Sequence, residues 1–240
     1  MEIREILLDI LSNYGNEKKQ KIAENEFVKK VETDYTDQIF KIAVSKYGER
    51  YLVDASCGTG QWAHCPWIAI FDTLVTSSAQ SGYYIVYLFN KDMDCVYLSL
   101  NQGVTSLRNH YKKDTDNVLL RRAGNFRCQL TLTEDSNQYI FDELALNEAS
   151  NLPKSYNKGN IIAKRYSIDK LPNEDELLKD LDIFINYYQQ LVASDSGEEL
   201  YIGLQDCKSV KENKALKLHY RFDRRGDVSN KVKKTQRIYV

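Results

Sequence analysis

The sequence has little that suits metal or disulfide chemistry. Its 240 residues include five cysteines at long spacings, without a CxxC pair, and only three histidines. An odd number of scattered cysteines is a poor framework for disulfides, and a structural zinc site needs closely paired ligands. We therefore expect no disulfide, no bound metal ion and no other cofactor.

Long apolar runs and phosphate-binding loops are also missing. No run approaches the roughly 20 apolar residues of a membrane span. The N-terminus, MEIREILLDI, is charged and amphipathic, unlike a signal peptide. The sequence contains neither a GK[ST] ending nor the GxGxxG spacing of nucleotide-binding loops. We expect a cytoplasmic protein without a membrane partner.

The charges are unevenly distributed along the chain. The net charge is −1, but residues 208–240 carry eleven Lys/Arg and three Asp/Glu. Residues 1–207 therefore carry 22 basic and 31 acidic side chains. Any affinity for nucleic acid has to come from local patches or from the basic tail.

The pattern of apolar residues predicts one α+β domain, with a mainly antiparallel twisted central sheet and helices packed on it. The segment 83–90 is apolar on both faces, so we expect it to be the central strand. NKDMD after it is typical of a tight hairpin turn, and NEASNLPKSYNKGN (147–160) of a loop. The expected strands are 51–56, 66–71, 83–90, 94–101 and 161–167, with weaker signals at 124–134 and 137–142.

Helix signals surround these strands. Helical spacing begins at Ile3 and Gly15 is expected to stop that helix, with a second, exposed helix over 16–32. Thr36 is expected to open the next helix and Gly48 to end it. Further helices are predicted over 104–122 and over Asn173–Val192, which Asn173 caps with acidic residues in its first turn.

An aromatic pair beside a glycine loop is the most informative feature. In GTGQWAHCPWIAIFD (58–72), the glycine loop runs into Trp67 at the start of a strand. Strand alternation places Trp67 and Phe71 on one face, and Tyr84, Val86 and Leu88 on one face of the next strand. Aromatic rings beside a loop suit stacking on a flat ligand such as a nucleobase, although tryptophan is also a common core residue.

Candidates for catalysis are weak. His64 and Cys65 are adjacent, so on a strand they would face opposite ways and could not form a Cys–His pair. The acidic residues, including Asp72, are not clustered in a nuclease pattern. We expect a binding domain rather than an enzyme, with an enzyme using His64, Cys65 and Asp72 as a competing hypothesis.

A basic segment near the end of the domain is a candidate for phosphate contacts. In LPKSYNKG (152–159), Tyr156 lies between Lys154 and Lys158, and Lys164 and Arg165 follow on the next strand. Such a loop can bind phosphate and cover a base. The same spacing is also typical of a solvated loop.

Four ordered blocks resemble the N-terminal domain of the McrB-type subunits of methyl-directed (type IV) restriction enzymes. They cover roughly residues 50–192 and comprise GTGQWAHCPWIAIFD, SGYYIVYLFNKDMDCVYLSLNQGVTSL, GNIIAKRYS and the acid-capped helix that follows. The resemblance implies a domain that senses modified cytosine, such as 5-methylcytosine, in double-stranded DNA by flipping the base into an aromatic pocket. It implies that Trp67, Tyr84, Leu88 and Tyr156 form that pocket.

One position departs from the family pattern. Thr59 stands where the family has a pocket tyrosine in the glycine loop, and threonine cannot stack, so the pocket or the accepted modification is expected to differ. The neighbouring Gly58, Gly60 and Gln61 are expected to contact the DNA backbone. Lys154, Lys158, Lys164 and Arg165 are expected to contact phosphates and to make binding sensitive to salt.

The expected organisation has three parts. Residues 1–48 form an N-terminal helical segment of the same domain, residues 49–205 sense the base, and residues 206–240 form a basic tail or linker. The tail resembles the lead-in to an HNH nuclease, which is itself absent, so a nuclease is expected in cis or as a separate subunit. Two alternatives stay open, namely a non-catalytic protein-interaction module and a domain that binds unmodified DNA.

Overall fold

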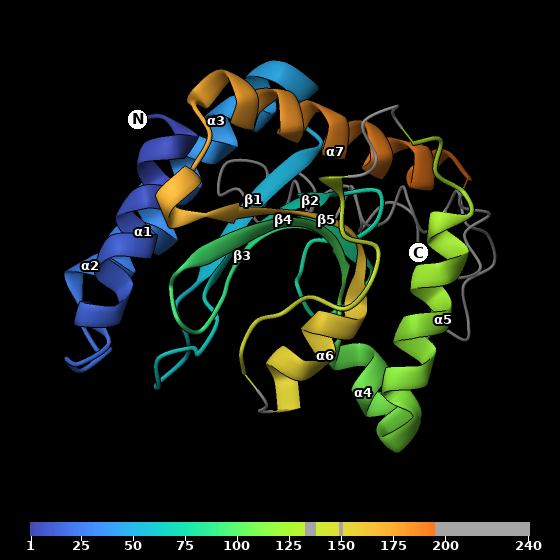
Figure 1. The fold of residues 1–240 in the computed structure, drawn as a ribbon, viewed down its shortest axis with the longest axis horizontal. Helices are drawn as coiled ribbons and strands as arrows, with labels where there is room; N and C mark the ends of the chain where they lie inside the picture. Colours follow the sequence, from blue (N-terminus) through green and yellow to red (C-terminus); the bar gives the residue numbers. More distant parts are fainter. Residues whose placement is uncertain (133–137, 149–150, 195–240) are drawn as a thin grey trace, which may run out of the picture.

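A five-stranded antiparallel sheet forms the centre of the molecule (Figure 1). The structure is a computed structural model that describes residues 1–132, 138–148 and 151–194. The strand order follows the sequence, so β3 is central, and the predicted α+β class is confirmed. The strands are β1 (Tyr51–Ser56), β2 (Trp67–Asp72), β3 (Tyr83–Phe89), β4 (Cys95–Gln102) and β5 (Asn160–Ser167).

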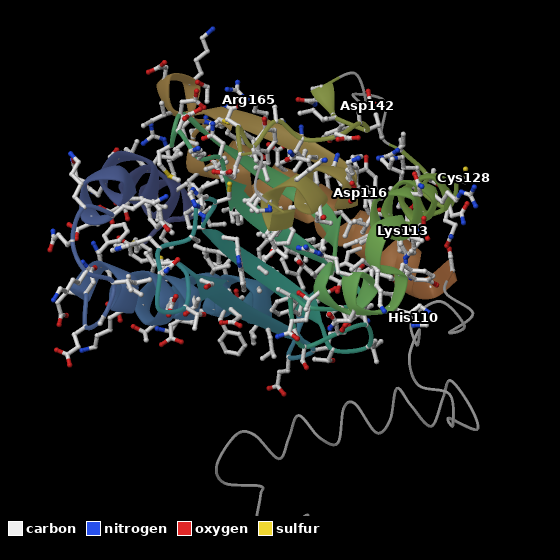
Figure 2. The ribbon with its side chains drawn as sticks, turned by 90° about the horizontal axis from the view of Figure 1, so that it is seen from below. His110, Lys113, Asp116, Cys128, Asp142 and Arg165 are labelled. Atoms are coloured by element: carbon white, nitrogen blue, oxygen red, sulfur yellow. The ribbon has the colours of Figure 1, made fainter. Side chains whose placement is uncertain are left out.

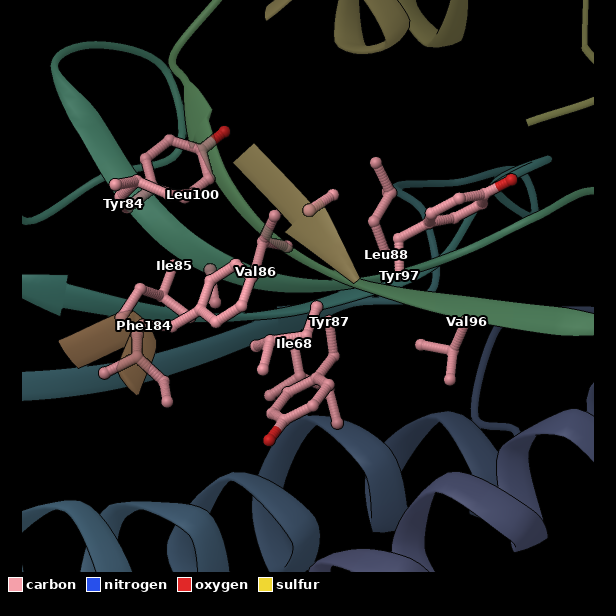
Figure 3. Packing of buried hydrophobic residues seen from close by; sticks show 14 of the residues in the cluster. Ile68, Tyr84, Ile85, Val86, Tyr87, Leu88, Val96, Tyr97, Leu100 and Phe184 are labelled. Carbon is pink, nitrogen blue, oxygen red and sulfur yellow. The ribbon is translucent and has the colours of Figure 1, made fainter. Parts of the chain in front are cut away.

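Strand register divides the side chains between two faces. Trp67 pairs with Leu88, and Tyr84 pairs with Asn101, so these four residues share one face. On β3, Tyr87 and the residues two positions away from it point to the other face. Figure 3 shows the division, with Tyr84 and Leu88 on one side of the sheet and Tyr87 on the side of the N-terminal helices. The predicted alternation is confirmed.

Three helices cover the face that carries Tyr87. They are α1 (Ile3–Glu17), α3 (Thr36–Tyr47) and α7 (Glu174–Ser194) (Figure 1). Asn173 caps α7 as predicted, because its Oδ1 accepts a hydrogen bond from the Glu176 amide at 3.0 Å. The Glu174 carboxylate accepts from the amides of Ile3 and Arg4, which ties the beginning of α7 to that of α1.

Three shorter helices lie at one end of the sheet. These are α4 (Thr105–Tyr111), α5 (Thr115–Arg127), which follows a 3₁₀ turn at Lys112–Asp114, and α6 (Asn151–Gly159). A small apolar cluster of Val104, Leu107 and Leu119 packs under them. The second, α5, packs against Tyr83 on the Tyr87 face, through Phe126 at a ring-centroid distance of 4.9 Å, and the other two lie on the opposite face. Part of this sheet face therefore remains uncovered by helices (Figure 1).

The N-terminal helix boundaries differ from the prediction. α1 runs through Gly15, because a single glycine in the last turn costs only about 1 kcal/mol. The expected helix over 16–32 is wrong for its first part, since Asn25 caps α2 (Glu26–Lys29) with hydrogen bonds from two amides. A π-helical segment, η1 (Lys30–Tyr35), then leads without a break into α3. α3 begins at Thr36 and Gly48 ends it, as predicted, but Thr36 does not cap the helix, because its hydroxyl donates to the carbonyls of Glu32 and Thr33.

Two predictions in the second half are also wrong. The segment expected as a strand from residue 124 begins inside α5, and residue 140 forms only an isolated bridge to Ala163. The expected loop at 147–160 is largely helix α6. Pro153 is compatible with that helix because it lies in the first turn, where backbone N–H groups have no intrahelical partner.

The remaining expectations on organisation fall partly outside the described residues. The hairpin turn after β3 is confirmed, since Asn90 Oδ1 accepts hydrogen bonds from the amides of Asp94 and Cys95. The basic tail, residues 206–240, lies outside the described residues. Among the residues that are described, no helix has the length and apolar character to cross a membrane.

Candidate nucleic-acid-base pocket

A pocket lies on the sheet face that the N-terminal helices leave open. It is open to solvent, and the space free of protein atoms in and above it amounts to about 240 Å³. Four residues that the resemblance assigned to a base pocket line it together. The lining side chains are Trp67, Tyr84, Val86, Leu88, Asn101 and Tyr156.

The sheet supplies the floor of this pocket. Tyr84 and Leu88 expose only 4% and 2% of their surface, because they lie on the central strand. The Tyr84 ring packs edge-on against Phe71, with centroids 5.2 Å apart, and its hydroxyl donates to the Ala79 carbonyl at 3.1 Å. Burial raises the pKa of this hydroxyl. Tyr84 is thus a neutral, fixed aromatic wall.

Two half-buried aromatic rings flank the opening. Trp67 begins β2, and Tyr156 projects from α6. Burial raises the pKa of the Tyr156 hydroxyl to about 12, and the positive charge of Arg108 opposes that shift. Tyr156 therefore remains uncharged at neutral pH. The two rings come from segments about 90 residues apart in the sequence, and only the tertiary fold brings them together.

A buried polar network fixes α6 to the sheet. Asn101 Nδ2 donates to the Tyr156 carbonyl at 3.1 Å and to Ser99 Oγ at 3.2 Å, and its Oδ1 accepts from the Gln102 amide. Ser99 in turn donates to Asn160 Oδ1 at 2.8 Å. A satisfied network of this kind holds a single geometry, because an unpaired polar group at this depth would be costly.

Gly159 allows this close approach. A Cβ atom at this position would lie 2.5 Å from Asn101 Oδ1, closer than real Cβ contacts allow. The end of α6 can therefore sit against Asn101 only because residue 159 has no side chain.

A known family covers most of the chain. Residues 9–193 match the family model described as MrcB-like, N-terminal domain. The chain belongs to this family. No curated protein matches the chain. Membership indicates a DNA-binding specificity module of McrB-type restriction systems, in which this domain binds rather than catalyses.

The glycine loop of the MrcB-like domain lies beside the pocket without lining it. Gly58 has φ +119°, and a Cβ there would lie 2.1 Å from the Gln61 carbonyl oxygen, so only glycine fits this turn. Thr59, Gly60 and Gln61 are exposed at the loop tip. The structure does not bring Thr59 into the pocket with the four other assigned residues.

The two tryptophans of the MrcB-like domain have different environments. Trp62 packs edge-on against Tyr14, with centroids 5.3 Å apart, and its indole N–H donates to the Gln20 carbonyl at 2.8 Å. It anchors the glycine loop to the end of α1. Trp67 lines the pocket instead, so only one of the two is placed to meet a ligand.

The four basic residues expected to contact phosphates do not form one surface. Lys164 lies on the opposite face of the sheet, where its Nζ binds Asp180 of α7 at 2.7 Å. Lys158 binds Asp116 at 3.2 Å, and Arg165 lies 3.7 Å from Asp94. Lys154 is exposed and forms no ion pair with any described residue. Lys164 therefore does not share a surface with the pocket.

Two lining residues of the MrcB-like domain were not predicted as site residues. Strand alternation had placed Val86 on the same face as Tyr84 and Leu88, and this signal was sufficient to predict Val86 as a pocket residue. Asn101 lies in the block YLSLNQG, and its pairing with Tyr84 across the strands depends on a register that the sequence did not provide. Its role as a link to α6 is a tertiary feature.

The candidates for catalysis are separated in the structure. His64 Nδ1 lies 3.0 Å from a Glu148 carboxylate oxygen that also binds Lys91 at 3.1 Å. Cys65 is buried, and burial raises the pKa of its thiol to about 12, so it is not a ready nucleophile. Asp72 lies at the far end of β2, paired with Arg50 at 2.7 Å. No group of three or more potential metal ligands occurs in the described part of the chain.

Proposed function

We propose that this domain recognises a modified cytosine in double-stranded DNA by accepting the flipped base into the pocket between Trp67 and Tyr156. The observation that supports this most directly is the convergence of aromatic and aliphatic side chains from β2, β3 and α6 on one opening. Trp67 and Tyr156 would stack on the base, and Tyr84 and Leu88 would contact its edge.

The energies are consistent with this role. Extruding a base costs a few kcal/mol, and each aromatic contact returns about 1–3 kcal/mol. Two flanking rings can therefore offset the cost of flipping. A half-buried ring can still gain from a ligand, since the bound base would remove the rest of its apolar surface from water.

Recognition of the modification has to come from the apolar floor. A methyl group that reaches Leu88 adds about 0.8 kcal/mol, which corresponds to roughly fourfold in affinity. Stronger discrimination requires a bulkier modification or steric exclusion of other bases by the fixed Tyr84 ring. Because Thr59 is not aromatic and does not line the pocket, residue 59 would not stack on a bound base.

The domain would act as the specificity part of a modification-dependent restriction system in the prokaryotic cytoplasm, without catalysis of its own. Residues 1–48 would belong to the same domain as the sensor at 49–205. Tyr14 supports this, because its hydroxyl bonds the carbonyls of Cys57 and Ala63 at the base of the glycine loop. Residues 206–240 would lead to a nuclease module in cis, such as an HNH domain, or act beside a nuclease subunit in trans.

Titration of fluorescent duplexes at low salt tests the proposal. Three duplexes are compared, which carry 5-methylcytosine, 5-hydroxymethylcytosine or unmodified cytosine at one position. The domain is expected to bind the two modified duplexes more tightly than the unmodified one. Leu88→Ala is expected to reduce the preference while retaining binding. Failure of all three duplexes to bind the folded domain would exclude the proposed function.

A further inference from the structure

The two helices that follow β4 are rich in positive charge. Residues 105–127, which form α4, the 3₁₀ turn and α5, contain six Lys/Arg and two Asp, for a net charge of +4. The remainder of residues 1–207 carries 16 Lys/Arg and 29 Asp/Glu. No acidic residue occurs between Asp94 and Asp114. We refer to residues 105–127 as the α4–α5 segment.

Several cations of the α4–α5 segment are free to meet a partner. Lys112, Lys113 and Arg121 are exposed, and Arg108 is half-buried. None of these four forms an ion pair with another residue in the described ranges. One of the two acidic residues, Asp116, is already paired with Lys158 of α6. Figure 2 shows Lys113 and His110 at the surface of this segment.

The α4–α5 segment lies next to the pocket. Tyr156 packs against its apolar cluster, and α5 packs along α6. Arg108 is close enough to the Tyr156 hydroxyl to lower its pKa against the effect of burial. The amide of Ser106 bonds the Gln80 carbonyl, one residue from the Ala79 carbonyl that holds Tyr84. The basic surface is therefore continuous with two walls of the pocket.

The backbone at Lys112 has an uncommon conformation. Its φ is +50° and its ψ is −113°, a region that residues with a Cβ rarely adopt. Lys112 ends α4 and turns the chain so that two consecutive lysines project at the corner between α4 and α5. Glycine would fit this backbone with less strain, so the positive φ at Lys112 has a cost in stability.

We propose that the α4–α5 segment is the main docking surface for the DNA backbone, with Arg108, Lys112, Lys113 and Arg121 contacting phosphates beside the flipped base. The inference rests on the proposed function, because it assigns the phosphate contacts of the same DNA. These four residues take the place of Lys158 and Lys164 as the expected phosphate contacts, because Lys158 and Lys164 form ion pairs with Asp116 and Asp180. DNA suits this surface because unpaired cations gain by releasing counterions from the duplex.

The test compares two variants that each remove two positive charges. Lys112→Gln/Lys113→Gln changes the α4–α5 segment, and Lys29→Gln/Lys41→Gln changes exposed lysines of α2 and α3 beside the opposite sheet face. Dissociation constants are measured for modified and unmodified duplexes over a series of salt concentrations. Thermal unfolding checks that each variant is folded.

The α4–α5 variant is expected to bind both duplexes more weakly by the same factor. The slope of log K against log salt should fall in magnitude by about 0.9 for each phosphate that the variant no longer neutralises. The control variant should keep the wild-type slope. A structural role of Lys112 and Lys113 would change unfolding without changing the slope.

The outcomes separate the inference from the function on which it rests. If the wild-type domain binds no duplex, the proposed function fails. If the wild type binds DNA but the α4–α5 variant retains its affinity and salt slope, this surface serves another partner and the inference is overturned. An equal effect of both variants would also overturn it, since the attraction would then depend on net charge alone.

Discussion

Asn101 on strand β4 donates a hydrogen bond from Nδ2 to the backbone carbonyl of Tyr156 on helix α6, at 3.1 Å. This bond joins the floor of the pocket to the helix that carries one of its two flanking rings. Since Asn101 also lines the pocket and pairs with Tyr84 across the strands, one side chain links three of the walls. The width of the opening therefore depends on how closely α6 approaches β4.

Gly159→Ala tests this dependence. The added Cβ would lie 2.5 Å from Asn101 Oδ1, so α6 or Asn101 has to move. We expect the free energy of unfolding to fall by about 1–3 kcal/mol, as for other overpacked sites, and the affinity for modified DNA to fall as well. Denaturant unfolding and duplex titration measure the two effects.

The matched control is Gly124→Ala in α5, where a Cβ meets no atom within 4 Å. Alanine is the better helix former, so this change should raise the free energy of unfolding by about 0.5–1 kcal/mol and leave affinity unchanged. If the two alanine variants had the same stability and the same affinity for modified DNA, the contact between residue 159 and Asn101 would not determine the geometry of the pocket.

The two tryptophans provide a second prediction. Trp67→Ala should weaken binding of modified DNA by about 1–3 kcal/mol, or roughly 5- to 150-fold, because one stacking surface is removed. Trp62→Phe keeps a ring against Tyr14 but removes the bond to Gln20 and part of the packed ring, so it should cost about 1–3 kcal/mol of stability and no affinity.

Fluorescence makes this experiment specific. The chain has two tryptophans, so Trp67 is the sole tryptophan of the Trp62→Phe variant. Its emission is expected to change on titration with modified DNA as a base stacks on the indole. Binding of DNA without any change in Trp67 emission would argue against a base in this pocket.

The cysteines give a prediction on pH. Burial raises the pKa of the Cys57 and Cys65 thiols to about 12, from 9.0 in the unfolded chain. Above pH 9 the unfolded state loses these protons while the folded state retains them, so folding stability should fall as pH rises from 9 to 12. Denaturant unfolding at a series of pH values measures this decrease.

Replacing both thiols serves as the control. Cys57→Ala/Cys65→Ala should reduce the decrease in stability between pH 9 and 10, whereas the decrease above pH 10 should remain, because burial also raises the pKa of tyrosines such as Tyr84 and Tyr156. The same burial predicts that an alkylating reagent at pH 8 modifies the exposed Cys128 and not Cys57 or Cys65. Cys207, outside the described residues, is replaced by serine in this assay. Rapid labelling of Cys65 in the folded domain would contradict the buried position.

Much of the sheet could be predicted from local pattern. Strand alternation placed Tyr84, Val86 and Leu88 on one face, and the hairpin turn at Asn90 placed β4 beside β3, although not their register. Signals of this kind lie within a few residues of each other. They predicted the central position of β3 and the aromatic face on which the pocket lies.

The segment before β5 shows where local pattern failed. Residues 147–160 are rich in Asn, Ser, Lys and Gly, which is typical of a loop, yet α6 forms there. Its stability comes from contacts with α5 and from the polar network at Asn101. The strand expected after residue 124 failed for a similar reason, because Arg127 at the end of α5 bonds the carbonyls of Asn160 and Ile161. Packing with distant residues outweighed the local propensity in both cases.

The sequence by itself determined which residues share a strand face, because the period of two is a property of the backbone, whereas the assignment of Trp67, Tyr84 and Tyr156 to one pocket came from the family resemblance. The tertiary structure decided which charges are free to meet a partner. Lys164 and Lys113 each have another basic residue beside them in the sequence, but Lys164 is bound to Asp180 across a helix–sheet contact and Lys113 is exposed at a corner. Ion pairing depends on what lies within a few ångströms in space, and residues far apart in the chain provide those neighbours.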